Sequence, residues 1–243
     1  MAGTTLEALR QRDVHVWVES LDVAGDRLEQ LTAFLSGDEL ERARRYRFRS
    51  DRDRFAAGRG RLRELLGGYL ALHPEDVCFQ YSAYGKPSVT SSANLQFNVS
   101  HSGAQVLFVF CCDAEVGVDV ELLHDQTADE LVAERFFAKR EVTELRRLPP
   151  ALQVRGFLSC WTRKEAYIKA RGEGLSLPLQ DFEVTLSPDE QPRLLRTAWS
   201  PTEAAEWRLH DLSRLCPGAV AALAVRGEER HVVAARDFEF STP

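Results

Sequence analysis

Lysine is scarce in this chain. Only four of its 31 basic residues are lysines, at positions 86, 139, 164 and 169, and the other 27 are arginines. Since arginine supplies the general positive charge, a lysine in this background is a candidate for a specific role, such as a compact charge on a phosphate. Chance placement is the alternative explanation for any one of them.

Other features are missing, and each absence narrows the function. No stretch is long and apolar enough to span a membrane, and the first 13 residues lack the apolar core of a signal peptide. The five cysteines are odd in number, and their spacing fits neither a zinc site nor a disulfide framework. We therefore expect buried free thiols, a cytoplasmic location and no membrane partner. The formal net charge of −6 argues against a general nucleic-acid binder.

Patterns of apolar residues predict a mixed chain of helices and strands. Ser36, followed three residues later by Glu39, is typical of a helix start. Alternating apolar and polar residues predict a strand at 14–21. Helices are expected at 36–45 and 53–72, further strands at 77–81, 106–112 and 117–122, and later strands at 182–186, 207–212 and 219–225.

The same order of elements occurs twice. Phe34–Arg45 (FLSGDELERARR) resembles Phe136–Arg147 (FFAKREVTELRR) at a spacing of 102 residues. We interpret this as an internal duplication that gives an α+β fold with pseudo-twofold symmetry. The expected halves are residues 1–115 and 116–243. A cleft between such halves is a common place for a ligand site.

Two acidic residues lie on one predicted strand, in Gly117-Val118-Asp119-Val120-Glu121. Alternate side chains of a strand share a face, so the valines would face a core while Asp119 and Glu121 point together to the other side. Adjacent carboxylates repel each other unless a positive charge neutralises them, and Mg²⁺ is a common solution. An exposed strand face with two solvated acids is the alternative.

A helix is predicted to follow, and it carries Trp161, Glu165 and Lys169 four residues apart on one face. Such a Glu–Lys pair is usually a mild surface salt bridge. Trp161 beside the pair suggests a partly apolar wall, which would raise the pKa of the carboxyl. The helix should end at Gly172, before a mobile turn into an extended segment that includes Pro178.

Two polar turns and an arginine-rich segment are candidates for anion binding. Phe97–Gly103 (FNVSHSG) offers hydroxyls, backbone N–H groups and an imidazole. A capped turn is the alternative, and a Ser/His hydrolase is disfavoured because no G-x-S-x-G elbow is present. Tyr84–Pro87 presents a lysine in a tight turn without being a P-loop. The segment 42–54 holds seven arginines, of which one or two could reach a phosphate while the rest face solvent.

Each of these motifs is weak alone, but their order is specific. G-K-P, F-N-V-S-H-S-G, G-V-D-V-E, W-x-x-K-E-A-x-x-K and G-L-S-L-P-L resemble, in that order, the 4′-phosphopantetheinyl transferase superfamily. The length, the apparent duplication and the F-F-x-K-x-E segment are similar to its monomeric, surfactin-synthetase-activating (Sfp-like) type. The resemblance runs from about Leu35 to Phe182.

The resemblance implies an activity and its reactants. The enzyme would transfer the 4′-phosphopantetheine arm of coenzyme A to a serine of an apo acyl or peptidyl carrier protein and release 3′,5′-ADP. Mg²⁺ would be its cofactor, and the chain would act as a monomer. The carrier would dock beside Gly172–Pro178.

The resemblance also assigns roles to residues. Glu165 would be the general base, and Lys169 would stabilise charge on the transferring phosphate. Coenzyme A would be held by Arg42, Arg49, Lys86, Ser100 and His101. Mg²⁺ would be held by Asp119, Glu121 and Glu141. Surfactin-type members of the family carry basic residues at two points early in the first helix to hold the 3′-phosphate. Here the first matching position is Glu39 and only the second, Arg42, is basic, so Arg49 is a candidate substitute.

Two other functions fit parts of the pattern. A non-catalytic scaffold that binds carrier proteins would be expected to have lost the acidic residues or the Glu165–Lys169 pair, and all of them are present. A Mg²⁺-dependent phosphodiesterase acting on coenzyme A-like pyrophosphates could use the same acids.

Overall fold

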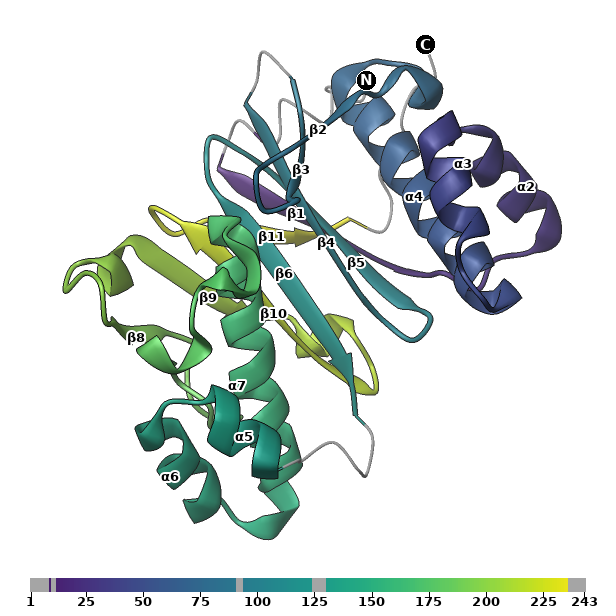
Figure 1. The fold of residues 1–243 in the computed structure, drawn as a ribbon. Coiled ribbons are helices and arrows are strands. Elements are labelled where there is room, and N and C mark those ends of the chain that lie inside the picture. The colour runs from purple at the N-terminus through teal and green to yellow at the C-terminus, as the bar shows by residue number, and fades with distance from the viewer. Residues whose placement is uncertain (1–8, 10–11, 91–93, 124–129, 236–243) are drawn as a thin grey trace.

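A computed structural model describes residue 9 and residues 12–90, 94–123 and 130–235 of the chain. It has the expected α+β composition, arranged in four layers of helix, sheet, sheet and helix (Figure 1). None of the described helices is long and apolar enough to cross a membrane.

The first sheet belongs mainly to the N-terminal part of the chain. Its strands lie in the order β11-β1-β5-β4. The bounds are β1 Asp13–Ser20, β4 Leu95–Ser102, β5 Gln105–Cys112 and β11 His231–Ala234. The helices beside it are α2 Gly25–Ala33, α3 Gly37–Arg44 and α4 Arg49–Leu70. Because β11 pairs in parallel with β1, a strand from the end of the chain lies in the sheet of the first half.

The second sheet has the order β6-β10-β9. Its strands are β6 Val116–Leu122, β9 Trp207–Asp211 and β10 Ala219–Arg226. The helices of this half are α5 Glu130–Phe136, α6 Lys139–Arg147 and α7 Pro150–Arg171. Two small sheets complete the strands, β2 Phe79–Tyr81 with β3 Pro87–Val89, and β7 Phe182–Val184 with β8 Leu194–Thr197. Short 3₁₀ turns lie at Pro74–Asp76, Gly174–Ser176, Leu179–Asp181, Glu203–Glu206 and Ser213–Leu215.

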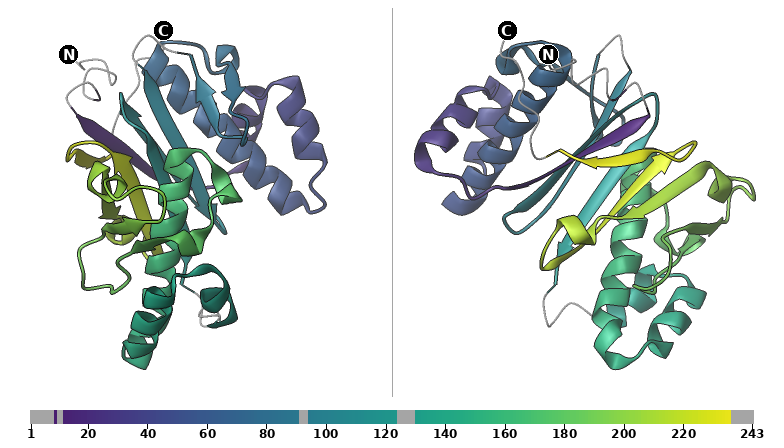
Figure 2. Two further views of the ribbon diagram at one scale, coloured as in Figure 1. Left: turned by 60° about the vertical axis from the view of Figure 1, so that its left-hand side comes forward. Right: turned by 180° about the vertical axis from the view of Figure 1, so that it is seen from behind.

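Strand alternation explains the layers, because successive side chains of a strand point to opposite faces. On β5, Leu107 and Val109 pack toward the second sheet, whereas Phe108 and Phe110 pack beneath α4. On β10 the alternate residues divide in the same way between the first sheet and α7. Helices α4 and α7 therefore cover the two outer faces, on opposite sides of the molecule (Figure 2).

The predicted face of β6 is confirmed. Val116, Val118 and Val120 are fully buried between the two sheets, so the residues between them face α7. One of these is Gly117, where an added Cβ would lie 2.2 Å from the carbonyl oxygen of Ala166 on α7. Only glycine allows α7 to lie this close to β6, and this close approach sets the distance between the acids of β6 and the polar face of α7.

A similar buried ion pair occurs in each half, with the two glutamates 102 residues apart and their cations 101 residues apart. Glu39 accepts a hydrogen bond from the backbone N–H of Ser36 and pairs with Arg63 at 2.7 Å. In the second half, Glu141 accepts from the N–H of Ala138 and pairs with Lys164 at 2.8 Å. In each half the buried cation also donates to carbonyl oxygens of the chain that follows the long helix. The helices α3 and α6 begin 102 residues apart, at Gly37 and Lys139, in agreement with the spacing seen in the sequence.

Candidate active site

The predicted acids of β6 lie beside α7 and β4. Lys169 of α7 donates hydrogen bonds to Asp119 Oδ1 at 2.6 Å and to Ser100 Oγ at 3.0 Å. Ser100 in turn donates to Asp119 Oδ1 at 2.8 Å, and Ser102 donates to Glu121 Oε2 at 3.0 Å. We call Asp119 and Glu121, together with Ser100 and Ser102 that bond to them, the acid group.

Glu165 lies on the same face of α7 as Lys169 and belongs to the acid group electrostatically. Its pKa is raised to about 7, first by burial and then by the negative charges of Asp119 and Glu121, against the opposing effect of Lys169. Burial likewise raises the pKa of Asp119, while Lys169 and Ser100 lower it. A carboxyl with a pKa near neutrality can accept a proton at physiological pH, which is the property that a general base needs.

The structure gives Lys169 a different partner from the one that helical spacing suggests. Its ammonium contacts Asp119 and Ser100, and no ion pair between Lys169 and Glu165 is present among the described residues. The surface salt bridge considered as an alternative for this pair is therefore not formed. The indole of Trp161 packs edge-on against Phe136 and nearly parallel to Phe157, at the middle of α7.

Glu141, predicted as a third metal ligand, is not brought to the acids of β6. Both of its oxygens are already bonded: Oε2 to Lys164 and the N–H of Ala138, and Oε1 to the N–H of Val184 at 2.8 Å. The residue is only 1% exposed and contacts the core of the second half. Its position after an F-F-x-K segment marks the start of α6, where a carboxylate caps the backbone N–H groups. The third acid near Asp119 and Glu121 is instead Glu165.

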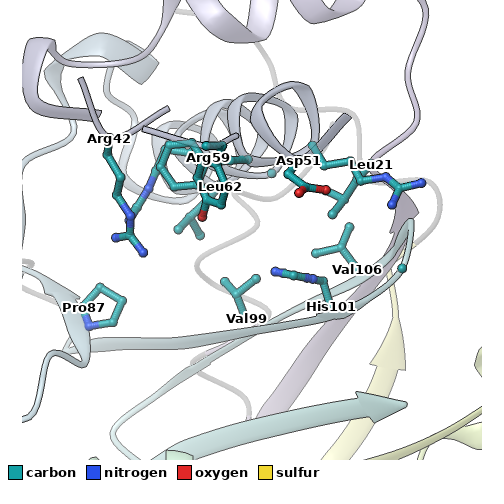
Figure 3. Close-up of a pocket in the computed structure, with 14 residues that line it drawn as sticks. Leu21, Arg42, Asp51, Arg59, Leu62, Pro87, Val99, His101 and Val106 are labelled. Atoms are coloured by element: carbon teal, nitrogen blue, oxygen red, sulfur yellow. The ribbon is translucent and has the colours of Figure 1, made fainter. Parts of the chain in front are cut away.

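A cavity of about 550 Å³ opens between helices α3 and α4 on one side and β4 on the other. Figure 3 shows Arg42 and Arg59 entering from the helices, while Val99 and His101 rise from β4 on the opposite side. His101 follows Ser100 directly, so one strand contributes to the acid group with one side chain and to the cavity with the next. The remaining lining residues are Leu21, Tyr46, Asp51, Arg54, Phe55, Gly58, Leu62, Pro87, Gly103 and Val106.

The charges around the cavity suit an anion. The pKa of His101 is lowered by burial and by the nearby positive charges of Lys169 and Arg54. Arg54 pairs with Asp22 at 2.7 Å. Arg59 has a buried Nη1 with no hydrogen-bond partner among the described residues. Three arginines and the imidazole thus face a cavity in which Asp51 is the acid.

The predicted coenzyme A ligands divide into two sets. Arg42 and His101 line the cavity. Arg49 points elsewhere, because its side chain is 84% exposed and pairs with Asp53. Lys86 donates to the carbonyl oxygens of Val116 at 3.2 Å and Ala170 at 2.7 Å.

Ser100 and Lys86 therefore have structural partners that their motifs did not reveal. Ser100 is 6% exposed and bonded within the acid group, and burial lowers the pKa of Lys86 to about 8. Arg54 and Arg59 are cavity residues that sequence reasoning missed as individuals. Arg54 belongs to the arginine-rich segment 42–54, in which one or two members were expected to reach a phosphate, whereas Arg59 lies outside that segment. A helical run does not show which of its arginines face the sheet.

Family models and curated relatives identify the family of this chain. A model of the 4′-phosphopantetheinyl transferase superfamily matches residues 115–234, and a model of the N-terminal part of such transferases matches residues 23–112. The solved structure of the holo-[acyl-carrier-protein] synthase of Thermotoga maritima overlays on 47% of this chain and 64% of its own, with 22% identity and a TM-score of 0.38.

Two curated relatives are similar over most of their length. The 4′-phosphopantetheinyl transferase HetI of a Nostoc species is 42% identical over 196 residues, which is 79% of this chain and 82% of HetI. The 4′-phosphopantetheinyl transferase Sfp of Bacillus subtilis is 34% identical over 164 residues, which is 67% of this chain and 71% of Sfp. The chain therefore belongs to the 4′-phosphopantetheinyl transferase superfamily.

Proposed function

We propose that this transferase moves the 4′-phosphopantetheine arm of coenzyme A onto a serine of an apo acyl or peptidyl carrier protein. The observation that supports this most directly is the position of the acid group and Lys169 beside a cavity lined by arginines and His101. The cavity takes the nucleotide part of coenzyme A, so that its diphosphate lies toward the acids.

The acid group is suited to one hard cation. Asp119 Oδ2 is buried and has no hydrogen-bond partner among the described residues, and such an oxygen is costly unless it is protonated or meets a positive charge. No three described Asp, Glu, His or Cys residues form a ready-made metal site. Mg²⁺ does not need three such ligands, since it commonly takes one or two carboxylates and completes its shell with water and substrate phosphates. We assign Asp119 and Glu121 as its ligands.

Glu165 and Lys169 serve the two ends of the transfer. Glu165 accepts the proton of the carrier serine while the oxygen of that serine bonds to the β-phosphorus of coenzyme A. The bond from that phosphorus to the bridging oxygen breaks, and 3′,5′-ADP leaves. Lys169 places a positive charge beside the phosphoryl group. Mg²⁺, when bound, polarises the phosphate and offsets charge on the leaving group.

Arg42 and His101 hold the 3′-phosphate in this proposal. Charge-assisted hydrogen bonds from a guanidinium to phosphate are short and strong, and a guanidinium can make two at once. The lowered pKa of His101 means that the imidazole takes up a proton most readily when an anion lies beside it. Lys86 contributes indirectly in this proposal: its hydrogen bonds to carbonyl oxygens of Val116 and Ala170 attach the β2–β3 hairpin to β6 and α7.

The two halves of the molecule are proposed to be products of a duplication, with the boundary near residue 115. The repeated buried ion pair supports this, and so do two family models that match on either side of residues 113–114. We further propose that the protein acts as a cytoplasmic monomer and that its macromolecular partner is the apo carrier protein.

The test is an incubation with coenzyme A and Mg²⁺, with and without an apo-carrier. We expect 3′,5′-ADP to form only when the carrier is present, together with a gain of one phosphopantetheine unit in the intact mass of the carrier. Release of 3′,5′-ADP without a carrier would indicate a phosphodiesterase instead. A panel of acyl, peptidyl and aryl carriers would then identify the accepted substrates.

A further inference from the structure

The edge strands of the two sheets, β4 and β6, lie side by side without a backbone ladder between them in the described chain. Side chains from alternate positions of β4 bridge the gap instead. Asn98 accepts a hydrogen bond from the N–H of Val118 at 3.0 Å. Ser100 and Ser102, the next two residues on the same face, reach the carboxylates of Asp119 and Glu121. We call Asn98, Ser100 and Ser102 the seam residues.

Ser102 is held so that its hydroxyl hydrogen has one direction to point. The N–H of Leu122 donates to Ser102 Oγ at 3.2 Å, and Ser102 Oγ donates to Glu121 Oε2 at 3.0 Å. Since a hydroxyl has a single hydrogen, a donor already directed at its oxygen leaves that hydrogen for the carboxylate. Ser100 repeats the arrangement, with the ammonium of Lys169 as the donor and Asp119 as the acceptor.

We propose that Ser102, with Ser100 as its counterpart, is a positioning residue: the two serines orient the carboxylates of Glu121 and Asp119 toward a bound Mg²⁺. Each serine occupies one oxygen of one acid, and for Asp119 the oxygen left over is the buried, unpartnered Oδ2 of the described chain. Hydrogen bonds to ligating carboxylates fix their orientation, and loss of such contacts typically lowers metal affinity or activity by roughly 10- to 100-fold. The inference rests on the proposed role of Asp119 and Glu121 as Mg²⁺ ligands.

The seam offers its own control. Asn98 bridges the same two strands but contacts a backbone N–H rather than a carboxylate. Asn98→Ala therefore weakens the junction of the sheets while leaving the hydrogen bonds to both acids in place. Ser102→Thr keeps the hydroxyl, and threonine is well suited to a strand. Ser102→Ala removes the hydroxyl alone.

The experiment measures Mn²⁺ binding to the full-length protein with saturating coenzyme A and no carrier, by the electron paramagnetic resonance signal of free Mn²⁺. Thermal unfolding without metal is recorded for each variant. We expect Ser102→Ala to raise the Kd for Mn²⁺ by about tenfold or more. Ser102→Thr and Asn98→Ala should stay within about twofold of the wild type, although Asn98→Ala should lower the Tm.

Three results would overturn separate parts of this proposal. A Ser102→Ala protein with wild-type Mn²⁺ affinity removes the positioning role. An equal loss of affinity in Asn98→Ala shows that only the junction of the sheets matters. If the wild type with coenzyme A fails to bind Mn²⁺ at all, the metal assignment of the proposed function fails instead.

Discussion

Burial and two neighbouring carboxylates oppose a negative charge on Glu165, and its pKa of about 7 follows from them. The same position allows two different roles, proton acceptor or additional metal ligand. The neighbours of Glu165 are the same for either role, so the structure does not choose between them. The two roles differ in how the rate of transfer in a Glu165 variant responds to the Mg²⁺ concentration.

Glu165→Gln should preserve coenzyme A binding and lose transfer. Glutamine has nearly the same shape, but it cannot take the serine proton, so kcat should fall by roughly 10²- to 10⁴-fold. Single-turnover transfer to an apo-carrier, followed over a Mg²⁺ titration, measures this. Partial recovery at high Mg²⁺ would identify Glu165 as a metal ligand, and a near wild-type rate at any Mg²⁺ level would remove it from both roles.

The pH dependence of metal stabilisation follows from the raised carboxyl pKa values. A carboxyl whose pKa is higher in the folded state favours the protonated form, so without a cation stability falls as the pH rises through about 7. Asp119 shifts in the same direction. A cation binds the charged carboxylates and must displace these protons. The rise in Tm caused by Mg²⁺ with coenzyme A should therefore be larger at pH 8 than at pH 6; equal rises would contradict this assignment.

Arg42 and Arg49 form a matched pair of predicted ligands that the structure separates. Arg42 lines the cavity, whereas Arg49 faces solvent and pairs with Asp53. Arg42→Ala should weaken coenzyme A binding by about tenfold or more, since it removes a charged hydrogen bond of roughly 1.5–3 kcal/mol. Arg49→Ala should change it by less than about twofold. Calorimetry with coenzyme A and desphospho-coenzyme A is the measurement, and the Arg42→Ala loss should be small for the ligand without the 3′-phosphate.

At the scale of elements, much of the architecture could be predicted from sequence. The valines of β6 alternate with acids, and this alternation predicts the shared face on which Asp119 and Glu121 lie. The long helix that carries Glu165 and Lys169 was predicted from its spacing and its glycine end. Such features depend on neighbours in the sequence, which a pattern can show.

Contacts between distant elements were harder to predict. Lys169 pairs with an acid 50 residues away, and Lys86 bonds to carbonyl oxygens of β6 and α7. Glu141 matched a motif but caps a helix beside Lys164. Each of these partners depends on which faces of two elements meet, and that information is absent from the spacing along one element.

The ion pair between Lys164 and Glu141 should be important for stability. Both side chains are almost completely enclosed, and removing one partner leaves a buried carboxyl without its cation. Lys164→Met should therefore lower the free energy of unfolding by roughly 3–5 kcal/mol. Arg140→Ala, which breaks an exposed pair with Glu144 on the same helix, should lower the free energy of unfolding far less, because solvent screens this pair. Urea unfolding measures both, and a similar small loss in the two variants would mean that the buried pair contributes little.

For the whole molecule, the main question is whether the two halves behave as separate domains. Strand β11 returns to the first sheet, and the seam residues join β4 to β6. The core between the two sheets contains residues of both halves, such as Val16 of β1 and Val118 of β6. We therefore propose that the boundary near residue 115 reflects the duplication and does not separate two independently folding domains, because one continuous core crosses it.

Thermal unfolding should therefore show a single cooperative transition. Calorimetry of the full chain is expected to give equal calorimetric and van't Hoff enthalpies. Two resolved transitions would show that the halves unfold independently. The sheet variant Asn98→Ala is informative here as well, because weakening the junction should lower the Tm without splitting the transition.

The placement of the lysines has a practical consequence for chemical labelling. Lys164 is enclosed in the core, and Lys86 is bonded to two carbonyl oxygens. Lys139 is exposed at the start of α6, and Lys169 is about one-third exposed beside Asp119 in the proposed active site. Among the described side chains, an amine-directed reagent thus has one target outside the proposed site and one within it. Because lysines are so few, labelling can be followed at single residues by peptide mass mapping. Bound nucleotide should protect Lys169 from the reagent, and Lys139, whose labelling should not change, would serve as the internal reference.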